Sequence, residues 1–314
     1  MRDYIVIFIL DAAGMILELV ASRLMSPYFG NSNFVWTAVI GIILLAGSLG
    51  NLIGGRLAAR KEARFCTTML LLFAAIYIAV TPLVGAPILE SIRNTGAEIQ
   101  VAAVMGSIIF FLIPSTILGI VPPIVMKERI GEGENKARES GRITAVIALG
   151  SLVGTFAGGF WLIPALGTKM IFVLIATMII LMVPLFRPLE NIRARVAKIV
   201  LFVASVIAVV VTAVAFANVN DGNLGSSDSV SIDTEYGRTI VEDGTYEGQE
   251  VRFYRQSGAY SSATFLNEDK KFDLVFDYLK KYDEMFEFLD VKNVAMIGGA
   301  AYQYPKYFIS HFFL

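Results

Sequence analysis

The chain has 314 residues, of which 56% are hydrophobic and only 17% are charged, and its mean hydropathy is +0.66. Soluble globular domains hold about 45–50% apolar and about 25% charged residues, so this composition excludes an ordinary soluble protein. A single cysteine and a single histidine exclude a disulfide and a Cys/His metal site, and we expect no metal. The net charge of −1 combines a basic part, residues 1–217, with an acidic part, residues 218–314, which indicates two different environments.

Seven apolar runs in residues 1–217 approach the length of about 20 residues that a helix needs to cross the hydrocarbon core. They are Tyr4 to Leu24, Val35 to Ala58, Cys66 to Val84, Ile99 to Val121, Ile143 to Leu166, Met170 to Phe186 and Ile199 to Ala217. We therefore predict an α-helical bundle of about seven transmembrane helices in a multi-pass protein of the cell membrane. The first run lacks a small-residue cleavage site, so we interpret it as a retained span and not as a signal peptide.

The distribution of basic residues in the short loops predicts the orientation, because cytoplasmic loops carry more lysine and arginine. Alternate loops are strongly basic, and the others are nearly free of positive charge. The basic residues are Arg56, Arg60, Lys61 and Arg64, then Lys127, Arg129, Lys136, Arg138 and Arg142, then Arg187, Arg193, Arg195 and Lys198. This pattern predicts a cytoplasmic N-terminus, and seven crossings then place residues 218–314 outside.

A glycine pattern occurs twice in the apolar part. Gly50, Gly54 and Gly55 recur 104 positions later as Gly154, Gly158 and Gly159, and a Gly-Ser-Leu triplet precedes each set. Small residues four apart allow helix backbones to approach closely in a membrane. The pattern indicates two repeats of three spans followed by a seventh span, as in many transporters. The alternative is simple helix packing, since glycine is common in membrane helices.

The first run carries ionisable residues where the membrane would lie. Asp11, Gly14, Glu18 and Ser22 fall on one helical face. Charged side chains at the centre of a bilayer cost about 2.5–3.5 kcal/mol each on insertion scales, so they usually face the bundle interior and pair. Arg23 lies off this face, so we expect Glu18 to find its partner on another helix. The face is either a cation or proton site or a structural polar contact.

After residue 217 the sequence becomes polar. Residues 218–231 are rich in glycine, serine, asparagine and aspartate and are interpreted as a linker. In residues 232–314, two β-prone runs, Arg238 to Glu242 and Val251 to Arg255, predict a hairpin with Asp243-Gly244 and Glu247-Gly248 between them. The apolar spacing then predicts a helix over Asp273 to Leu289.

The last segment resembles the opening of a nucleotide-binding sheet. Asn293 to Ile297 is predicted as a buried strand, a glycine-rich turn follows it, and Pro305 occupies the first turn of a further helix. Strand, glycine-rich turn and helix together open a doubly wound Rossmann-like sheet, in which the turn approaches a ligand. The fold class expected for the whole chain is therefore a membrane bundle followed by a partial α/β domain. The turn alone is a weak signal, because many sheets contain such units without a ligand.

Several short motifs point to one family. The membrane part contains Glu18-x4-Arg23-x3-Pro27-Tyr28-Phe29-Gly30-Asn31-Ser32 and continues through Trp36 to Gly54-Gly55-Arg56. The polar part contains Asp233-Thr234-x-Tyr236, Tyr282-Asp283-Glu284-Met285 and Met296-Ile297-Gly298-Gly299-Ala300-Ala301-Tyr302-Gln303-Tyr304-Pro305-Lys306. Over nearly its whole length the chain resembles the fused transporter-like/spermidine synthase proteins.

The resemblance implies an aminopropyltransferase, which moves an aminopropyl group from decarboxylated S-adenosylmethionine to putrescine on a Rossmann-like fold. It implies that the turn at Gly298, Gly299 and Ala300 approaches the nucleoside donor, and that Tyr282 and Glu284 lie by the substrates. It implies no metal and no cofactor beyond this co-substrate. The implied partners are the lipid bilayer, polyamines and a second subunit of a homodimer, with no nucleic acid.

The chain also departs from the family pattern. Ala300 replaces the usual third glycine, and the sequence ends before the ribose-binding acid and the amine-activating aspartate of the family. No catalytic residue is therefore assigned, and we expect a C-terminally truncated form that is inactive by itself. Adenosyl donors are cytoplasmic, whereas the predicted topology places this domain outside. The alternative function is a membrane transporter or polyamine-binding membrane protein.

Overall fold

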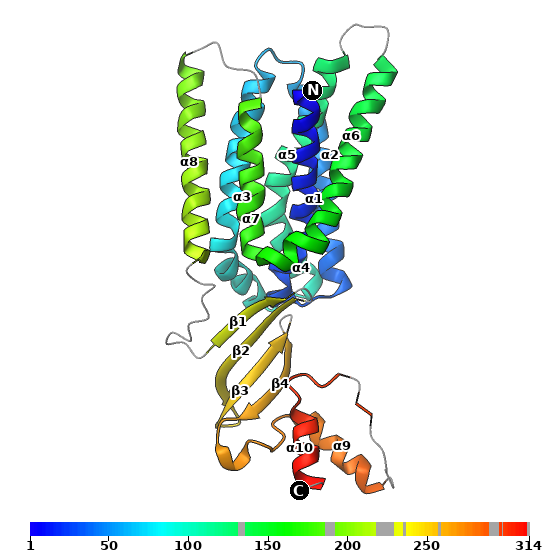
Figure 1. Cartoon of the computed structure of the whole chain (residues 1–314), viewed down its shortest axis with the longest axis vertical. Coiled ribbons are helices and arrows are strands. Elements are labelled where there is room, and N and C mark those ends of the chain that lie inside the picture. The colour runs from blue at the N-terminus through cyan, green and yellow to red at the C-terminus, as the bar shows by residue number, and fades with distance from the viewer. Residues whose placement is uncertain are drawn as a thin grey trace. The chain divides into compact units, whose positions relative to one another are not determined.

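The computed structural model describes residues 1–130, 136–185, 192–217, 229–234, 237–256, 259–288, 295–296 and 298–312. The protein is mostly helical and divides into two compact units, Met1–Asp221 and Gly222–Leu314 (Figure 1). The predicted linker, residues 218–231, lies outside the described residues except for its last three, which begin the first strand.

The first unit is a bundle of long helices. Its elements are α1 (Arg2–Phe29), α2 (Asn33–Leu57), α3 (Ala63–Asn94), α4 (Ile99–Ser107), the π-helical turn η1 (Ile108–Leu112), α5 (Ile113–Ile130), α6 (Lys136–Ala157), the π-helical turn η2 (Gly158–Leu162), α7 (Ile163–Met182), the short turn η3 (Val183–Leu185) and α8 (Ile192–Ala217). Within the described residues, five continuous helices are long and apolar enough to cross a membrane: Arg2–Phe29, Asn33–Leu57, Ala63–Asn94, Ile99–Ile130 and Lys136–Leu185.

The last of these five contains a sharp break. Lys136–Leu185 has 50 residues, and a straight helix of that length would extend about 75 Å, more than twice the hydrocarbon thickness of about 30 Å. Gly167 interrupts it with φ 71° and ψ 167°, a conformation that glycine adopts without strain. The chain reverses direction there, so α6 and α7 run in opposite directions (Figure 1). The break lies between the fifth and sixth apolar runs of the sequence.

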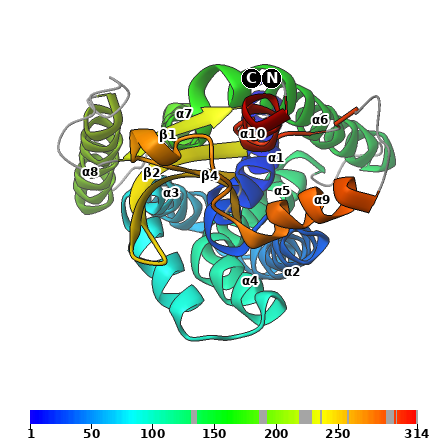
Figure 2. The same ribbon diagram turned by 90° about the horizontal axis from the view of Figure 1, so that it is seen from below.

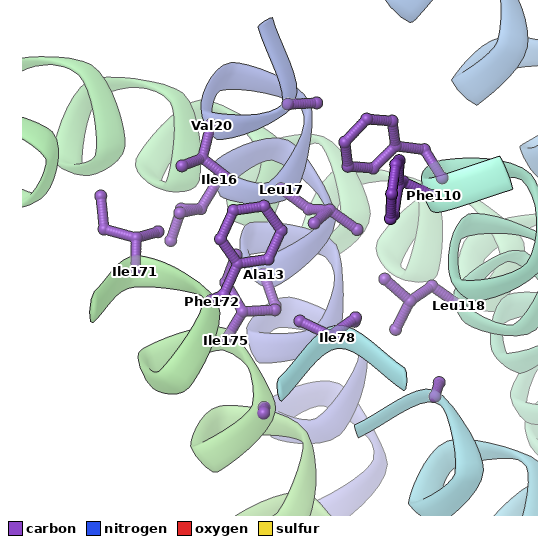
Figure 3. Close-up of a cluster of buried hydrophobic side chains, with 14 of the residues drawn as sticks. Ala13, Ile16, Leu17, Val20, Ile78, Phe110, Leu118, Ile171, Phe172 and Ile175 are labelled. Carbon is purple, nitrogen blue, oxygen red and sulfur yellow. The ribbon is translucent and has the colours of Figure 1, made fainter. Parts of the chain in front are cut away.

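Helix α1 is the centre of the bundle. Viewed along the bundle, it lies among α2, α3, α5, α6 and α7, whereas α8 lies at the edge (Figure 2). A helix that is apolar on all sides is buried either in a protein core or in lipid, and neighbouring helices cover much of α1. Figure 3 shows its residues packed against α3, η1, α5 and α7. The labelled residues are Ala13, Ile16, Leu17, Val20, Ile78, Phe110, Leu118, Ile171, Phe172 and Ile175.

Several glycines of the bundle, among them Gly54 and Gly154 of the repeated pattern, lie directly against the backbone of a neighbouring helix. A Cβ atom on Gly54 of α2 would lie 2.5 Å from the Ile120 carbonyl oxygen of α5. A Cβ atom on Gly154 of α6 would lie 2.7 Å from the Ala12 Cα atom of α1. Since real Cβ atoms do not approach so closely, only glycine permits these backbones to touch. The α2–α5 and α6–α1 pairs therefore pack in the same way.

Charged side chains join three helices at the end of the bundle where α1 begins. The Asp3 carboxylate accepts from Arg129 Nε at 2.8 Å and pairs with Arg64 at 3.2 Å. Arg64 also donates from Nε to the Glu128 carboxylate at 2.7 Å. These groups belong to α1, α3 and α5, so the network holds the three helix ends together. The arginines are among the basic residues that predict a cytoplasmic end.

The second unit contains an antiparallel sheet with the order β1-β2-β3-β4 in its described residues. The strands are β1 (Ser229–Thr234), β2 (Gly237–Tyr246), β3 (Gln249–Gln256) and β4 (Ala259–Phe265). The predicted hairpin is confirmed as β2–β3. Its turn is Glu247-Gly248, with φ 51° and 78°, as a two-residue type I′ turn requires. The Asp243-Gly244 pair is not a turn but part of β2, where Asp243 pairs with Arg252.

The described residues of the unit also form two helices and a short turn: η4 (Glu268–Lys270), α9 (Asp277–Phe288) and α10 (Gln303–Phe312). Helix α9 is shorter than the predicted Asp273 to Leu289, because Leu274 and Val275 are buried in the loop before it. Pro305 lies in the first turn of α10 as predicted. The described residues form no parallel strand pair, and Asn293 to Ile297, predicted as a buried strand, lies mostly outside them. A Rossmann-like sheet is therefore not observed.

The glycine contacts predict a sharp difference between two neighbouring positions. In Gly54→Ala the new methyl group meets Ile120 backbone atoms that cannot rotate away, so we expect the bundle to lose about 1–3 kcal/mol of stability. In Gly55→Ala the methyl group meets nothing within 4 Å, so this variant is the matched control. Thermal unfolding of the full chain in detergent measures the melting temperature of both variants. Equal melting temperatures would contradict the close contact.

Candidate functional site

The bundle contains a cavity of about 390 Å³ between α1, α2 and α5, with one wall residue from α6. Asp11, Gly14 and Glu18 line it, so three of the four residues predicted on one polar face of α1 meet there. The fourth, Ser22, is buried elsewhere, and its hydroxyl donates to the Leu19 carbonyl oxygen at 3.0 Å. The structure thus directs the intramembrane carboxylates inward, as their high cost in lipid requires.

The two carboxylates differ in their partners. The Ser151 hydroxyl of α6 donates to Asp11, which gives that carboxylate a partner on a neighbouring helix. Within the described residues Glu18 has no hydrogen bond or ion pair, so the expected partner on another helix is not observed. Arg23 does not belong to the described lining of the cavity.

Sequence reasoning missed three polar residues of this cavity. Ser48 and Asn51 reach it from α2, and Ser115 reaches it from α5. Ser48 belongs to the first Gly-Ser-Leu triplet, and Ser151 belongs to the second, so both triplets provide hydroxyl groups beside the carboxylates. Their signal in the sequence is a polar side chain in the middle of an apolar run.

The second unit contains a cavity of about 440 Å³ that gathers the residues implied by the family resemblance. Tyr282 of α9 lines it together with Gly298, Gly299 and Ala300. The rest of the lining is Ser261, Ser262, Tyr278, Leu279, Ala295, Met296, Gln303 and Tyr304. The structure therefore brings the tyrosine motif and the glycine-rich turn to one site.

The glycine-rich turn leaves its backbone accessible. Gly298 has φ 76°, which favours glycine, and a Cβ atom at Gly298 or Gly299 would meet nothing within 4 Å. A ligand can therefore approach this backbone closely, as the glycine-rich turns of nucleoside sites allow. Ala300, with φ 36°, continues the turn in a conformation that is uncommon for a residue with a side chain.

Three tyrosines form the aromatic wall of this cavity. Tyr304 is only 4% exposed, and its ring meets the Tyr282 ring edge-on at 5.2 Å between centroids. The Tyr278 hydroxyl donates to the Ser261 carbonyl oxygen at 3.4 Å. Burial raises the pKa of Tyr278 above its ordinary value, and the neighbouring Tyr282 acts in the same direction. The hydroxyl therefore remains a protonated donor at neutral pH.

Gln303 holds the site together, and sequence reasoning did not select it. Its side-chain oxygen accepts from the Ala263 backbone N–H of β4 at 3.2 Å and from the Ser262 hydroxyl at 3.3 Å. Its side-chain nitrogen donates to the Asp273 carbonyl oxygen at 3.0 Å. A buried amide of this kind joins α10, β4 and the loop before α9. No local pattern marks it, because its partners lie 30 to 41 residues away in the sequence.

Glu284 is not part of the described lining of the second cavity. It is exposed, and its carboxylate accepts from Lys281 Nζ at 2.7 Å on the same helix. Of the two substrate-side residues implied by the resemblance, only Tyr282 thus reaches the cavity. Within the described residues no three histidine, cysteine or acidic side chains gather where they could hold a metal ion.

The buried amide predicts a local loss of stability. Gln303→Leu leaves the Ala263 N–H and the Asp273 carbonyl without their partner, and each buried unsatisfied group costs about 1–3 kcal/mol. We expect faster hydrogen exchange of the β4 amides, measured by mass spectrometry on the full chain. Gln249→Leu, at an exposed glutamine, is the control and should leave exchange unchanged. Unchanged β4 exchange in Gln303→Leu would contradict this role.

Comparisons with known proteins identify no relative: no protein-family model matches the chain, and no curated protein or solved structure resembles it significantly. The function is therefore inferred from the two cavities and from the short motifs that line one of them.

Proposed function

We propose that the chain is a membrane-anchored, spermidine synthase-like protein whose second unit binds decarboxylated S-adenosylmethionine. One observation carries the proposal: Tyr282 and the turn at Gly298, Gly299 and Ala300 line the same cavity. These are the positions that the family resemblance assigns to the substrates and to the nucleoside donor. Their proximity in one cavity supports the proposal independently of the sequence motifs in which they occur.

The chemistry of the lining suits such a donor. The cavity has open glycine backbone on one wall and tyrosine rings on another. Aromatic rings stack on a purine base, and their negative faces attract a cation such as a sulfonium or an ammonium group. Decarboxylated S-adenosylmethionine carries a purine base, a sulfonium and an ammonium group, which the tyrosine rings of the lining suit.

The charge of the lining distinguishes a nucleoside from a nucleotide. The described lining contains no lysine, arginine, aspartate or glutamate. Phosphate groups are usually held by arginine or lysine side chains, and the N-terminus of α10 at Gln303 is here without such a partner in the described lining. A cavity of neutral side chains therefore favours an adenosyl compound without phosphates over ATP or a dinucleotide.

Aminopropyl transfer places a further demand on the site. The amine nitrogen attacks the carbon next to the sulfonium, a C–N bond forms, the C–S bond breaks, and methylthioadenosine leaves. The nitrogen then gives its proton to a base, which must lie within hydrogen-bond reach. Since the described lining offers no carboxylate, we assign these residues to donor binding and not to proton removal.

The anchor in this proposal is a bundle of seven crossings. The break at Gly167 divides Lys136–Leu185 into two spans, and α8, whose apolar part includes Ile199–Ala215, provides the seventh. With the basic loops inside, the N-terminus is cytoplasmic, and the second unit follows α8 on the opposite side.

Ligand binding tests the donor site. In isothermal titration calorimetry we expect the full chain in detergent to bind decarboxylated S-adenosylmethionine and methylthioadenosine. We expect no measurable binding of ATP. Tyr282→Ala removes an aromatic wall, so we expect about tenfold weaker binding, which corresponds to about 1.4 kcal/mol.

The matched control is Tyr302→Ala, because Tyr302 is 74% exposed and lies in the same turn without lining the cavity. An equal loss of donor affinity in both variants would contradict a nucleoside site at Tyr282. Affinity for ATP equal to that for decarboxylated S-adenosylmethionine would also contradict it.

Labelling of cysteines tests the orientation. Cys66 is free and exposed at the start of α3, on the side predicted as cytoplasmic. We expect a membrane-impermeant maleimide to label Gln249→Cys in a Cys66→Ser background from outside intact cells, and to label native Cys66 only after lysis. The reverse pattern would contradict the proposed orientation, and labelling of both from one side would contradict seven crossings.

A further inference from the structure

The bundle cavity is lined by residues from two halves of the first unit that correspond at several positions. Five pairs of lining residues are separated by the same 104 positions as the repeated glycines. The pairs are Asp11 with Ser115, Gly14 with Leu118, Met15 with Gly119, Glu18 with Pro122, and Ile43 with Ile147.

The helix contacts follow the same rule. The contact of Gly50 with Thr116 corresponds to the contact of Gly154 with Ala12, each partner being shifted by 104 positions. Helices α1 and α5 run in opposite directions (Figure 1), as inverted repeats require. Membrane carriers built from inverted repeats place their substrate site between the repeats, near the middle of the membrane. The cavity occupies that place.

The two halves contribute different groups to the cavity. Helix α1 contributes the Asp11 and Glu18 carboxylates, while α5 contributes Pro122 at the position matching Glu18. Pro122 and Pro123 lack an N–H group, so the carbonyls of Leu118 and Gly119 receive no hydrogen bond along the helix. Both of these residues line the cavity. The cavity therefore combines two carboxylates with two lining residues whose carbonyls lack the usual helical donor four residues later, and its described lining contains no cationic side chain.

The acceptors suit a ligand rich in N–H donors. A primary ammonium has three such donors and no acceptor. Asp11 and Glu18 lie seven residues apart, which is about 10 Å along the helix at the usual rise. A four-carbon diamine, with bonds of about 1.5 Å, has its two nitrogens about 6 Å apart. Charge-assisted hydrogen bonds of about 2.8 Å at both ends bridge the remaining distance.

We propose that the bundle cavity binds a linear alkyl diammonium ion, with one ammonium group at Asp11 and the other at Glu18. The methylene chain lies along the apolar lining, which includes Leu10, Met15 and Leu118. Each polar end of the ligand meets a carboxylate, and its apolar middle meets apolar side chains. A bare metal ion would leave most of the 390 Å³ unfilled and would contact only one carboxylate at a time.

Equilibrium binding of radiolabelled 1,4-diaminobutane to the full chain in lipid nanodiscs tests the site. We expect saturable binding that 1-aminobutane displaces at least tenfold less effectively, because it reaches one carboxylate only. Glu18→Gln removes the second charge, so we expect at least tenfold weaker diamine binding. Glu90→Gln makes the same change at an exposed glutamate of α3 outside the cavity and should bind as the unaltered chain does.

Three outcomes overturn the proposal: equal affinity for the diamine and 1-aminobutane, unchanged diamine binding in Glu18→Gln, and displacement of the diamine by sodium ions at equal concentration. The last would identify an inorganic cation site. Circular dichroism and the melting temperature of each variant verify that the bundle is folded.

A second variant tests the distance between the carboxylates without removing a charge. Glu18→Asp shortens the side chain by one methylene, about 1.5 Å, so the preference should move from the four-carbon toward the five-carbon diamine. An unchanged preference for chain length would overturn the end-to-end arrangement. Glu18→Gln, which tests the bundle cavity, should leave binding of decarboxylated S-adenosylmethionine unaltered, so failure of one proposal is distinguishable from failure of the other.

Discussion

The bundle depends on backbone-to-backbone contact at a few glycines. Gly50 and Gly54 allow α2 to touch α5, and Gly150 and Gly154 allow α6 to touch α1. In a membrane, apolar side chains gain little by leaving lipid, so close packing of backbones supplies much of the specificity between helices. Helix α2 thus packs against α5, and α6 packs against α1. The cavity lies where α1, α2 and α5 meet.

Helix α1 combines two properties that oppose each other. It is apolar on nearly all sides and is buried accordingly, yet it carries Asp11 and Glu18 near its middle. Lipid does not tolerate such groups well, and a tightly packed core would leave them without solvation. The cavity resolves this conflict, because it gives the carboxylates open space beside Ser48, Asn51 and Ser115 inside an otherwise apolar bundle. The Ser151 hydroxyl stabilises one of them from α6.

The second unit is organised by a buried amide and not by a large core. Gln303 bonds to β4 and to the loop before α9, and it follows directly after the glycine-rich turn. Because the amide fixes the start of α10, it also fixes the turn beside Tyr282 and Tyr304. The neutral, aromatic character of this cavity contrasts with the acidic cavity of the bundle. For this reason we propose an adenosyl compound as the ligand of the first and an alkyl diammonium ion as the ligand of the second.

Local patterns determined much of this structure. The apolar runs predicted the membrane helices, the Glu247-Gly248 pair closes the β2–β3 hairpin, and Pro305 lies in the first turn of α10. These features were predictable because each of them depends on residues that are neighbours in the sequence. Strand pairing and helix faces depend on distant residues. The described residues show an antiparallel order β1-β2-β3-β4, whereas Asn293 to Ile297, where a parallel sheet was expected, lies mostly outside them. Asn51, Ser115 and Gln303 acquire their roles only when helices and strands far apart in the sequence meet.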